Sequence, residues 1–106
     1  MIKPDRSTDT RDYGFFRCSH AFTGTSETVY MMHDKPHVSA AIHPDTGTAK
    51  IQFSLSAASE IEAGRGKWID WTKGSVAAST ADSLMGAVIA IRGVATATAT
   101  LEVCAQ

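Results

Sequence analysis

Gly86 to Ala105, GAVIAIRGVATATATLEVCA, is the stretch that decides the fold of this chain. It contains two runs rich in apolar and β-branched residues, Val88 to Ala95 and Thr98 to Cys104, separated by Thr96 and Ala97. In the second run, apolar residues alternate with threonine and glutamate, which is the period of two that a half-buried strand requires. We therefore predict that a β-hairpin closes the chain, with its turn at Thr96 and Ala97.

Length and charge indicate a small single-domain protein and exclude several classes of partner. A chain of 106 residues can build one modest core, since folded chains of this size still leave roughly a third of their unfolded surface exposed. The 10 basic and 11 acidic residues give a net charge of -1, whereas domains that neutralise nucleic-acid phosphates are plainly basic on one face. No apolar run approaches the roughly 20 residues of a membrane span, and the polar N-terminus does not resemble a secretory signal. We expect a protein made in the cytoplasm, with no nucleic-acid or membrane partner.

Four further runs have the pattern of short strands. They are Phe15 to Thr23, Thr28 to Met32, His37 to His43 and Thr48 to Ser56. The last has the clearest alternation in the chain, with Ile51, Phe53 and Leu55 on one face. Pro44 to Gly47 is predicted to be a turn, because proline fixes its first corner and glycine accepts a left-handed conformation. A second hairpin is therefore expected from the two runs that flank this turn.

The region that follows carries weaker signals. Residues 57–66 are compatible with one helical turn capped by Ser59 or with a loop, and Lys67 to Gly74 with a short strand containing a bulge or bend. Ser75 to Ala81 is expected to be an extended link, and Asp82 to Met85 a turn. About six short strands with turn signals at regular spacing predict an all-β fold, a small antiparallel β-sandwich or barrel.

The first 13 residues differ in composition from the rest of the chain. They are mostly polar and charged, so they bury too little apolar surface to offset the entropy of ordering. We predict a flexible N-terminal arm over residues 1–13 and a single β-domain over residues 14–106. Lys3, Arg6 and Arg11 are candidate partner-binding residues, because an arm that becomes ordered on a neighbour would place its charges at the contact.

The β-domain is also expected to associate with copies of itself. Its strands contain few of the inward charges or edge prolines by which monomeric sheets prevent edge-to-edge pairing. We therefore predict a closed homo-oligomer, with a trimer as the preferred state.

Candidate catalytic and metal-binding residues do not form a motif. His33 and His37 are four residues apart, but Pro36 lies between them and argues against the helix that would bring them together as metal ligands. Ser19 and His20 lack the surrounding residues of a nucleophile elbow. We predict no enzymatic activity, no metal and no cofactor.

The two cysteines, Cys18 and Cys104, lie in separate candidate strands. With no export signal, we expect both thiols to stay reduced and to be buried as small apolar residues. A disulfide that bridges adjacent strands is the alternative.

Three larger side chains are further candidates for partner contact. Trp68 and Trp71 are expected to lie in the core or in a subunit interface, with a stacking platform for sugar rings as the alternative. Arg92 interrupts an apolar strand, so it should face solvent, pair with an acid such as Asp70 or Glu102, or lie at a subunit boundary.

A resemblance to known proteins rests on the C-terminal half of the chain. Trp68-Ile69-Asp70-Trp71, Lys73-Gly74, a link of small residues, Ala87 to Arg92 and Ala97 to Val103 follow one another in that order. This succession resembles the C-terminal part of small β-rich virion proteins of tailed bacteriophages. The resemblance covers roughly residues 48 to 105, implies structural work in a particle, and carries over no catalytic residue.

The resemblance implies a virion structural protein. We expect a capsid decoration, or cement, protein that binds the major capsid protein or another virion protein at capsid subunit junctions. One alternative is a phage tail or neck component, and a second is a carbohydrate-binding module that uses Trp68 and Trp71.

Overall fold

A computed structural model describes residues 16–31, 37–84 and 88–105 of the chain. The predicted arm over residues 1–13, with Lys3, Arg6 and Arg11, lies outside the described residues, as does His33. None of the helices in the described ranges is long and apolar enough to cross a membrane.

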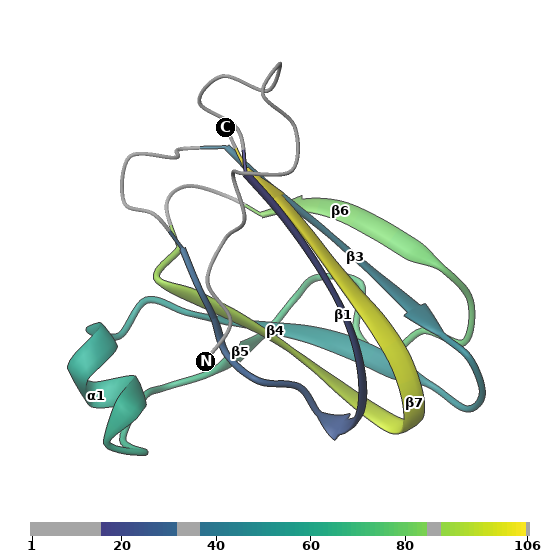
Figure 1. Cartoon of the computed structure of the whole chain (residues 1–106), viewed down its shortest axis with the longest axis horizontal. Helices are drawn as coiled ribbons and strands as arrows, with labels where there is room; N and C mark the ends of the chain where they lie inside the picture. The colour runs from purple at the N-terminus through teal and green to yellow at the C-terminus, as the bar shows by residue number, and fades with distance from the viewer. Residues whose placement is uncertain (1–15, 32–36, 85–87, 106) are drawn as a thin grey trace.

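Seven strands and one short helix make up the described fold (Figure 1). In chain order they are β1 Phe16–Thr25, β2 Val29–Tyr30, β3 Val38–Pro44, β4 Ala49–Ser54, α1 Ala58–Glu62, β5 Ile69–Asp70, β6 Thr80–Leu84 and β7 Ala90–Ala105. Every pair of neighbouring strands is antiparallel. The predicted all-β antiparallel fold is confirmed.

The C-terminal stretch is one bent strand of 16 residues, β7, and not the predicted hairpin. Its second half pairs with β1 on one side and β3 on the other, while its first half pairs with β2 and β4. Figure 1 shows the ribbon of β7 bending between these two halves. The expected turn residues Thr96 and Ala97 therefore lie inside a strand, at its bend.

The bend of β7 divides the sheet into two layers that curl over a common core. The β3 layer contains β1, the second half of β7, β3 and β6; the β4 layer contains β2, the first half of β7, β4 and β5. The predicted second hairpin is also wrong in its pairing, because β3 and β4 hydrogen-bond to different halves of β7 and not to each other. The turn between them thus carries the chain from one layer to the other.

The turn and the bend hold each other in place. Thr96 Oγ1 accepts from the backbone N–H of Thr48 at 2.9 Å, and the Thr96 N–H donates to the Thr48 carbonyl at 2.9 Å. Gly47 has the left-handed φ of 70° that a turn glycine accepts. On the other side of β7, the register with β1 shifts between Thr23 and Thr25, and this irregularity lets β1 follow the bend.

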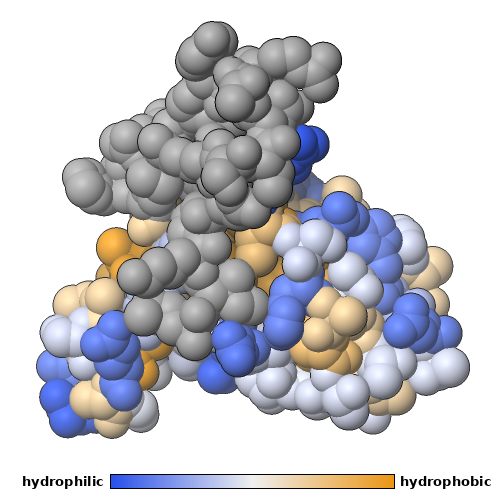
Figure 2. Space-filling model, in the orientation of Figure 1, coloured by the Kyte–Doolittle hydropathy of each residue, from blue (hydrophilic) through white to orange (hydrophobic). Residues whose placement is uncertain are grey.

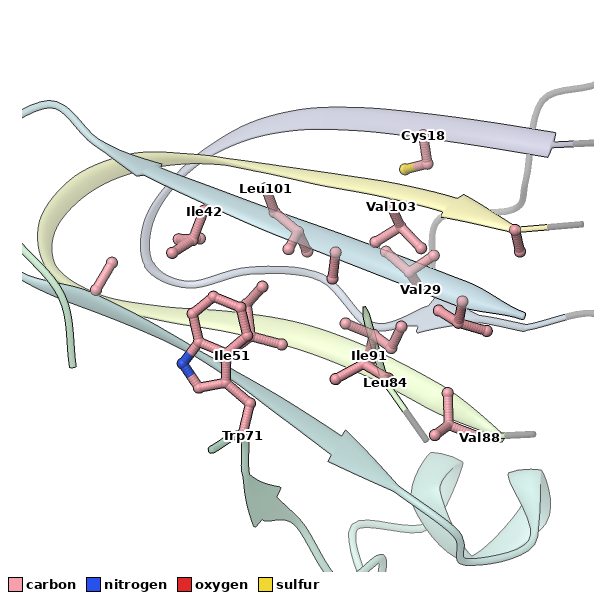
Figure 3. Close-up of a cluster of buried hydrophobic side chains, with 14 of the residues drawn as sticks. Cys18, Val29, Ile42, Ile51, Trp71, Leu84, Val88, Ile91, Leu101 and Val103 are labelled. Carbon is pink, nitrogen blue, oxygen red and sulfur yellow. The ribbon is translucent and has the colours of Figure 1, made fainter. Parts of the chain in front are cut away.

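The core lies between the two layers and is filled by aliphatic and aromatic side chains (Figure 3). Alternate residues of β7 point into it, among them Ile91, Leu101 and Val103, each 2% exposed or less. Ile42 from β3 and Ile51 from β4 meet them from the two layers and are fully buried. At roughly 25 cal/mol per Å² of apolar surface, this burial is the main favourable term in folding.

Three weaker predictions can now be compared with the structure. The helical turn is present as α1, but Ala57 is its N-cap and no side chain caps it, so Ser59 does not have the predicted role. The turn expected at Asp82 to Met85 is wrong over residues 82–84, which belong to β6 and pair with β3. The short strand predicted within Lys67 to Gly74 is present as β5.

The cysteines lie on adjacent strands but on opposite faces of the sheet. Cys18 faces the core opposite Val103, whereas Cys104 faces outward opposite Arg17 and is half-buried. Neighbouring positions that point to opposite faces cannot be bridged without moving the backbone, so no disulfide joins the pair. The expectation of burial holds for Cys18 and is wrong for Cys104.

Candidate functional site

The outer face of the β4 layer brings two of the predicted partner-binding residues, Trp68 and Arg92, together. In the register of the sheet, Asp70 of β5 lies opposite Gln52 of β4, and Gln52 lies opposite Arg92 of β7. These three side chains form one row across three strands, because residues directly opposite each other share a face. We call this row, together with Lys50 and Trp68, the Arg92 cluster.

Hydrogen bonds join the row from end to end. Arg92 Nε donates to Gln52 Oε1 at 2.8 Å, and Gln52 Nε2 donates to Asp70 Oδ1 at 2.8 Å. Lys50 Nζ reaches Asp70 Oδ2 at 3.1 Å. The amide of Gln52 therefore has its orientation fixed at both ends, since its oxygen can only accept and its nitrogen can only donate.

Trp68 covers the arginine. Arg92 Cζ lies 4.2 Å from the centre of the Trp68 ring, within the range of a cation–π contact. Burial lowers the pKa of Arg92 from its ordinary value because desolvation penalises the charged form. Arg92 thus reaches Asp70 only through Gln52, so direct pairing with Asp70, one of the three arrangements expected from the sequence, is not formed.

The acidic end of the cluster, Asp70, and the basic end, Arg92, differ in the groups that surround them. Hydrogen bonds from Gln52, and then from Lys50, lower the pKa of the Asp70 carboxyl, which is exposed. Asp70 is therefore held in its charged form and already has a cation beside it. Arg92 has an amide and an indole ring as its neighbours but no carboxylate among the described residues.

Trp71 does not join this face. It is 3% exposed, belongs to the core, and its Nε1 donates to the Gly74 carbonyl at 2.7 Å. Trp68 and Trp71 therefore point to opposite sides of the sheet, and the two-ring platform of a carbohydrate-binding module is not formed. As a core residue, Trp71 offers no surface to a partner in this conformation, which corrects its assignment as a contact residue.

A second polar cluster, which the sequence did not indicate, lies on the outer face of the β3 layer. His43 Nδ1 lies 2.8 Å from Ser79 Oγ, and His43 Nε2 contacts Glu102 Oε1. The side chains of His43 and Glu102 are 37% and 53% exposed, so water competes for each of these contacts. These contacts hold the segment that precedes β6 against strands β3 and β7.

A serine, a histidine and a carboxylate in series are also the components of a nucleophile triad. Here all of them lie largely exposed on a sheet face, where water competes for each contact. We therefore interpret this cluster as a structural contact. Only the strand register brings these residues together, and no local pattern in the sequence links positions 43, 79 and 102.

The interior of the curled sheet does not supply metal ligands. The inward-facing side chains of β3, β4 and β7 are mainly aliphatic, among them Ile42, Ile51, Ile91 and Leu101. Across residues 16–31, 37–84 and 88–105, no three His, Cys, Asp or Glu side chains come together in a group that could hold a metal ion. The described residues therefore do not fit a metal centre.

Comparison with solved structures shows a likeness of the curled antiparallel β-fold and no assignment to a family. No protein-family model matches the sequence, and no curated protein sequence matches it significantly. An oxalate oxidase structure matches with a TM-score of 0.50 and 13% identity, over 88% of this chain and 42% of that chain. The chain therefore spans less than half the length of that protein, and the likeness shows the fold alone.

Two further solved structures match less closely. A cupin-2 domain protein from Shewanella frigidimarina matches with a TM-score of 0.45 and 12% identity, over 95% of this chain and 76% of that chain. A subunit of Bacillus endospore appendages, described as disulfide-linked pili, matches with a TM-score of 0.46 and 13% identity, over 87% and 86% of the two chains.

Proposed function

We propose that this protein is a structural subunit that assembles through the edges of its sheet, and that it serves as a decoration protein of a phage head. The observation that carries the proposal is the long edge strand β1. Among the described strands it pairs with β7 alone, so from Cys18 to Thr23 its other edge has no described partner. A strand edge of this length is a template for pairing with another chain.

The side chains of β1 do not block such pairing. Ser19, Ala21 and Thr23 point outward, are exposed, and are small and uncharged. Monomeric proteins commonly place lysine or proline at such positions to prevent edge-to-edge association. The composition of β1 therefore favours a contact with a neighbouring subunit.

Among the described strands, the β3 layer ends in β1 on one side and β6 on the other. Within this described set, β6 pairs only with β3. Pairing β1 of one subunit with β6 of the next would be a head-to-tail contact, which generates a ring when the rotation closes. This geometry supports the homo-oligomer expected from the sequence, with a trimer as one closed solution.

The assignment to a virion is supported in addition by the resemblance of residues 48 to 105 to phage virion proteins. A decoration protein binds capsid subunit junctions, including those of the major capsid protein, and it adds buried area at many symmetric copies without catalysis. Such a protein is made in the host cytoplasm and needs no cofactor. Surface composition is compatible with repeated contacts, since hydrophobic and hydrophilic residues are interspersed on the described surface in Figure 2.

Copy number in purified virions tests the proposal. We expect quantitative mass spectrometry to find hundreds of copies per particle, because decoration occupies every equivalent capsid site. Six or twelve copies would instead indicate a tail or neck component. Absence from the particle would refute both assignments.

A further inference from the structure

We propose that Arg92 is a preformed receptor for a carboxylate, and that it binds an aspartate or glutamate side chain of the partner protein. This inference rests on the proposed function, because it names the chemistry by which the assembly partner is recognised. It begins from the Arg92 cluster on the outer face of the β4 layer.

The guanidinium of Arg92 is fixed in orientation before any partner arrives. Its Nε donates to Gln52 at 2.8 Å, and one of its faces lies 4.2 Å from the Trp68 ring centre. Gln52 is itself held by Asp70 at 2.8 Å. Because an ordinary surface arginine loses considerable rotamer entropy when it binds, this prior ordering lowers the cost of association.

The two Nη nitrogens of Arg92 make no hydrogen bond to a described residue. Within the part of the chain that the structure describes, the contacts of Arg92 are the hydrogen bond to Gln52 and the stacking on Trp68, and neither uses an Nη nitrogen. A guanidinium presents these donors as a planar fork that matches the two oxygens of a carboxylate. The unused side of the fork is therefore a bidentate site.

Charge also favours an anion at this position. Arg92 is half-buried and has lost part of its hydration, yet no carboxylate among the described residues contacts it. The neighbouring acid, Asp70, is already engaged by Gln52 and Lys50. A partner carboxylate would stabilise the charge of Arg92, which has lost part of its stabilisation by water.

The same geometry favours a carboxylate over a phosphate. Asp70 binds the far end of the Gln52 amide whose other end holds Arg92, so a negative charge lies one side chain away from the fork. Because Asp70 and Lys50 already form an ion pair, a partner needs only one negative charge to neutralise Arg92, and a carboxylate brings one whereas a phosphate dianion brings two. Arginine and tryptophan are moreover two of the residue types that are enriched at the energetic centres of protein interfaces.

The receptor can be tested on the isolated protein, without knowledge of the partner. Acetate and phosphate are titrated at constant ionic strength while the arginine side-chain N–H signals are followed by NMR. We expect acetate to shift the Arg92 signals and to leave those of Arg65 unchanged, because Arg65 Nε already donates to Glu60 at 2.7 Å. Equal shifts at both arginines, or a larger effect of phosphate, would overturn the proposal.

Binding to the partner is tested with matched variants. Arg92→Lys keeps the charge but removes the fork, and Lys73→Gln removes an exposed positive charge from a loop outside the cluster. We expect Arg92→Lys to weaken binding to particles stripped of this protein by roughly 10- to 100-fold and Lys73→Gln to leave it within about twofold. Unchanged binding of Arg92→Lys would refute the inference, provided that circular dichroism shows the variant folded.

The two experiments separate this inference from the proposed function. If the wild-type protein does not bind particles but acetate shifts Arg92 selectively, the virion assignment fails and the carboxylate receptor stands. If the protein binds particles and acetate has no selective effect, the receptor fails while the structural role stands.

Discussion

Gly93 lies in the first half of β7 at a position that faces the core, where a side chain has no room. A Cβ atom built there would lie 2.6 Å from Phe22 Cζ and 3.2 Å from Ile42 Cδ1. Phe22 comes from β1 and Ile42 from β3, so this glycine makes room for side chains from two other strands. Packing, and not backbone conformation, is therefore the reason that position 93 requires glycine.

Replacing this glycine should destabilise the protein. We expect Gly93→Ala to reduce the free energy of unfolding by about 1–3 kcal/mol, because the added methyl group forces Phe22 from its position. Urea unfolding followed by tryptophan fluorescence measures the change. Gly64→Ala is not a suitable control because Gly64 has a φ of 80°, so Ala81→Gly at an exposed strand position serves instead. Equal stability of Gly93→Ala and the wild type would contradict the packing argument.

Asp70 gives the stability of the protein a dependence on pH. Its pKa in the folded state lies below the ordinary value of about 3.9, owing first to the hydrogen bond from Gln52 and then to that from Lys50. The unfolded state therefore binds the proton more tightly, and the stabilisation is fully present above the ordinary pKa. It is lost as the pH falls through the lower, folded pKa.

The corresponding measurement compares two proteins across pH. We expect the wild type to be more stable than Asp70→Asn at pH 7, and the difference to shrink as the pH falls below about 4. Urea midpoints between pH 7 and pH 2.5 provide the test. A difference that stays constant over this range would show that the carboxylate charge of Asp70 does not contribute.

At the scale of elements, β5 places two tryptophans of one short segment on opposite sides of the sheet. Trp71 follows the strand, faces the core, and donates its indole N–H to Gly74 at 2.7 Å. Trp68 precedes the strand and lies against Arg92 on the outer face. The two tryptophans are three residues apart in an extended segment that contains a strand of only two residues, so their rings point to opposite sides. In a helix, the same spacing would have placed both rings on one face.

Substituting the two tryptophans separately distinguishes their roles. We expect Trp71→Ala to cost about 3–5 kcal/mol of unfolding free energy, because it leaves a large cavity in the core. Trp68→Ala should cost about 1 kcal/mol or less, the size of a partly exposed cation–π contact. Chemical denaturation of both variants tests this order, and a larger loss at Trp68 than at Trp71 would reverse the assignment.

At the scale of the whole molecule, the two end strands of the β3 layer determine how copies would join. In a head-to-tail contact, β1 of one copy pairs with β6 of the next, so both strands take part. In a twofold contact, β1 pairs with β1 of the other copy, and β6 takes no part. The exposed residues Ala21 of β1 and Ser83 of β6 are positions at which a charge would oppose each contact without disturbing the core.

We expect Ala21→Lys to lower the oligomeric state of the protein in solution, as measured by light scattering coupled to size-exclusion chromatography. Under head-to-tail pairing, Ser83→Lys should have the same effect, and under twofold pairing it should have none. Ala58→Lys, an exposed position in α1, is the matched control for an added charge. A wild-type protein that is monomeric at micromolar concentration would contradict assembly through these edges.

The sequence alone predicted the all-β class and the positions of several strands, including the core-facing residues of β1 and β3. A period of two indicates which side chains are buried only within a strand, and β4 buries Ile51 as the alternation of Thr48 to Ser56 predicts. The strand ends at Ser54, so the prediction is wrong beyond Phe53: Ser54 is fully buried and Leu55, expected on the same face as Ile51, is 60% exposed. The sequence also indicated that Arg92 needs a polar partner, because a charge in an apolar strand is costly without one.

Only the tertiary structure decided which strands pair and where the sheet bends. The alternation of β7 continues through Thr96 and Ala97 without a break, so the same pattern suits a hairpin and a bent strand equally. The choice depends on distant residues: the turn at Gly47 and Thr48 bonds to Thr96, and β3 and β4 take separate halves of β7. The row from Asp70 through Gln52 to Arg92 depends on the same long-range register. Burial is encoded residue by residue, whereas pairing is a property of segments that are far apart in the chain.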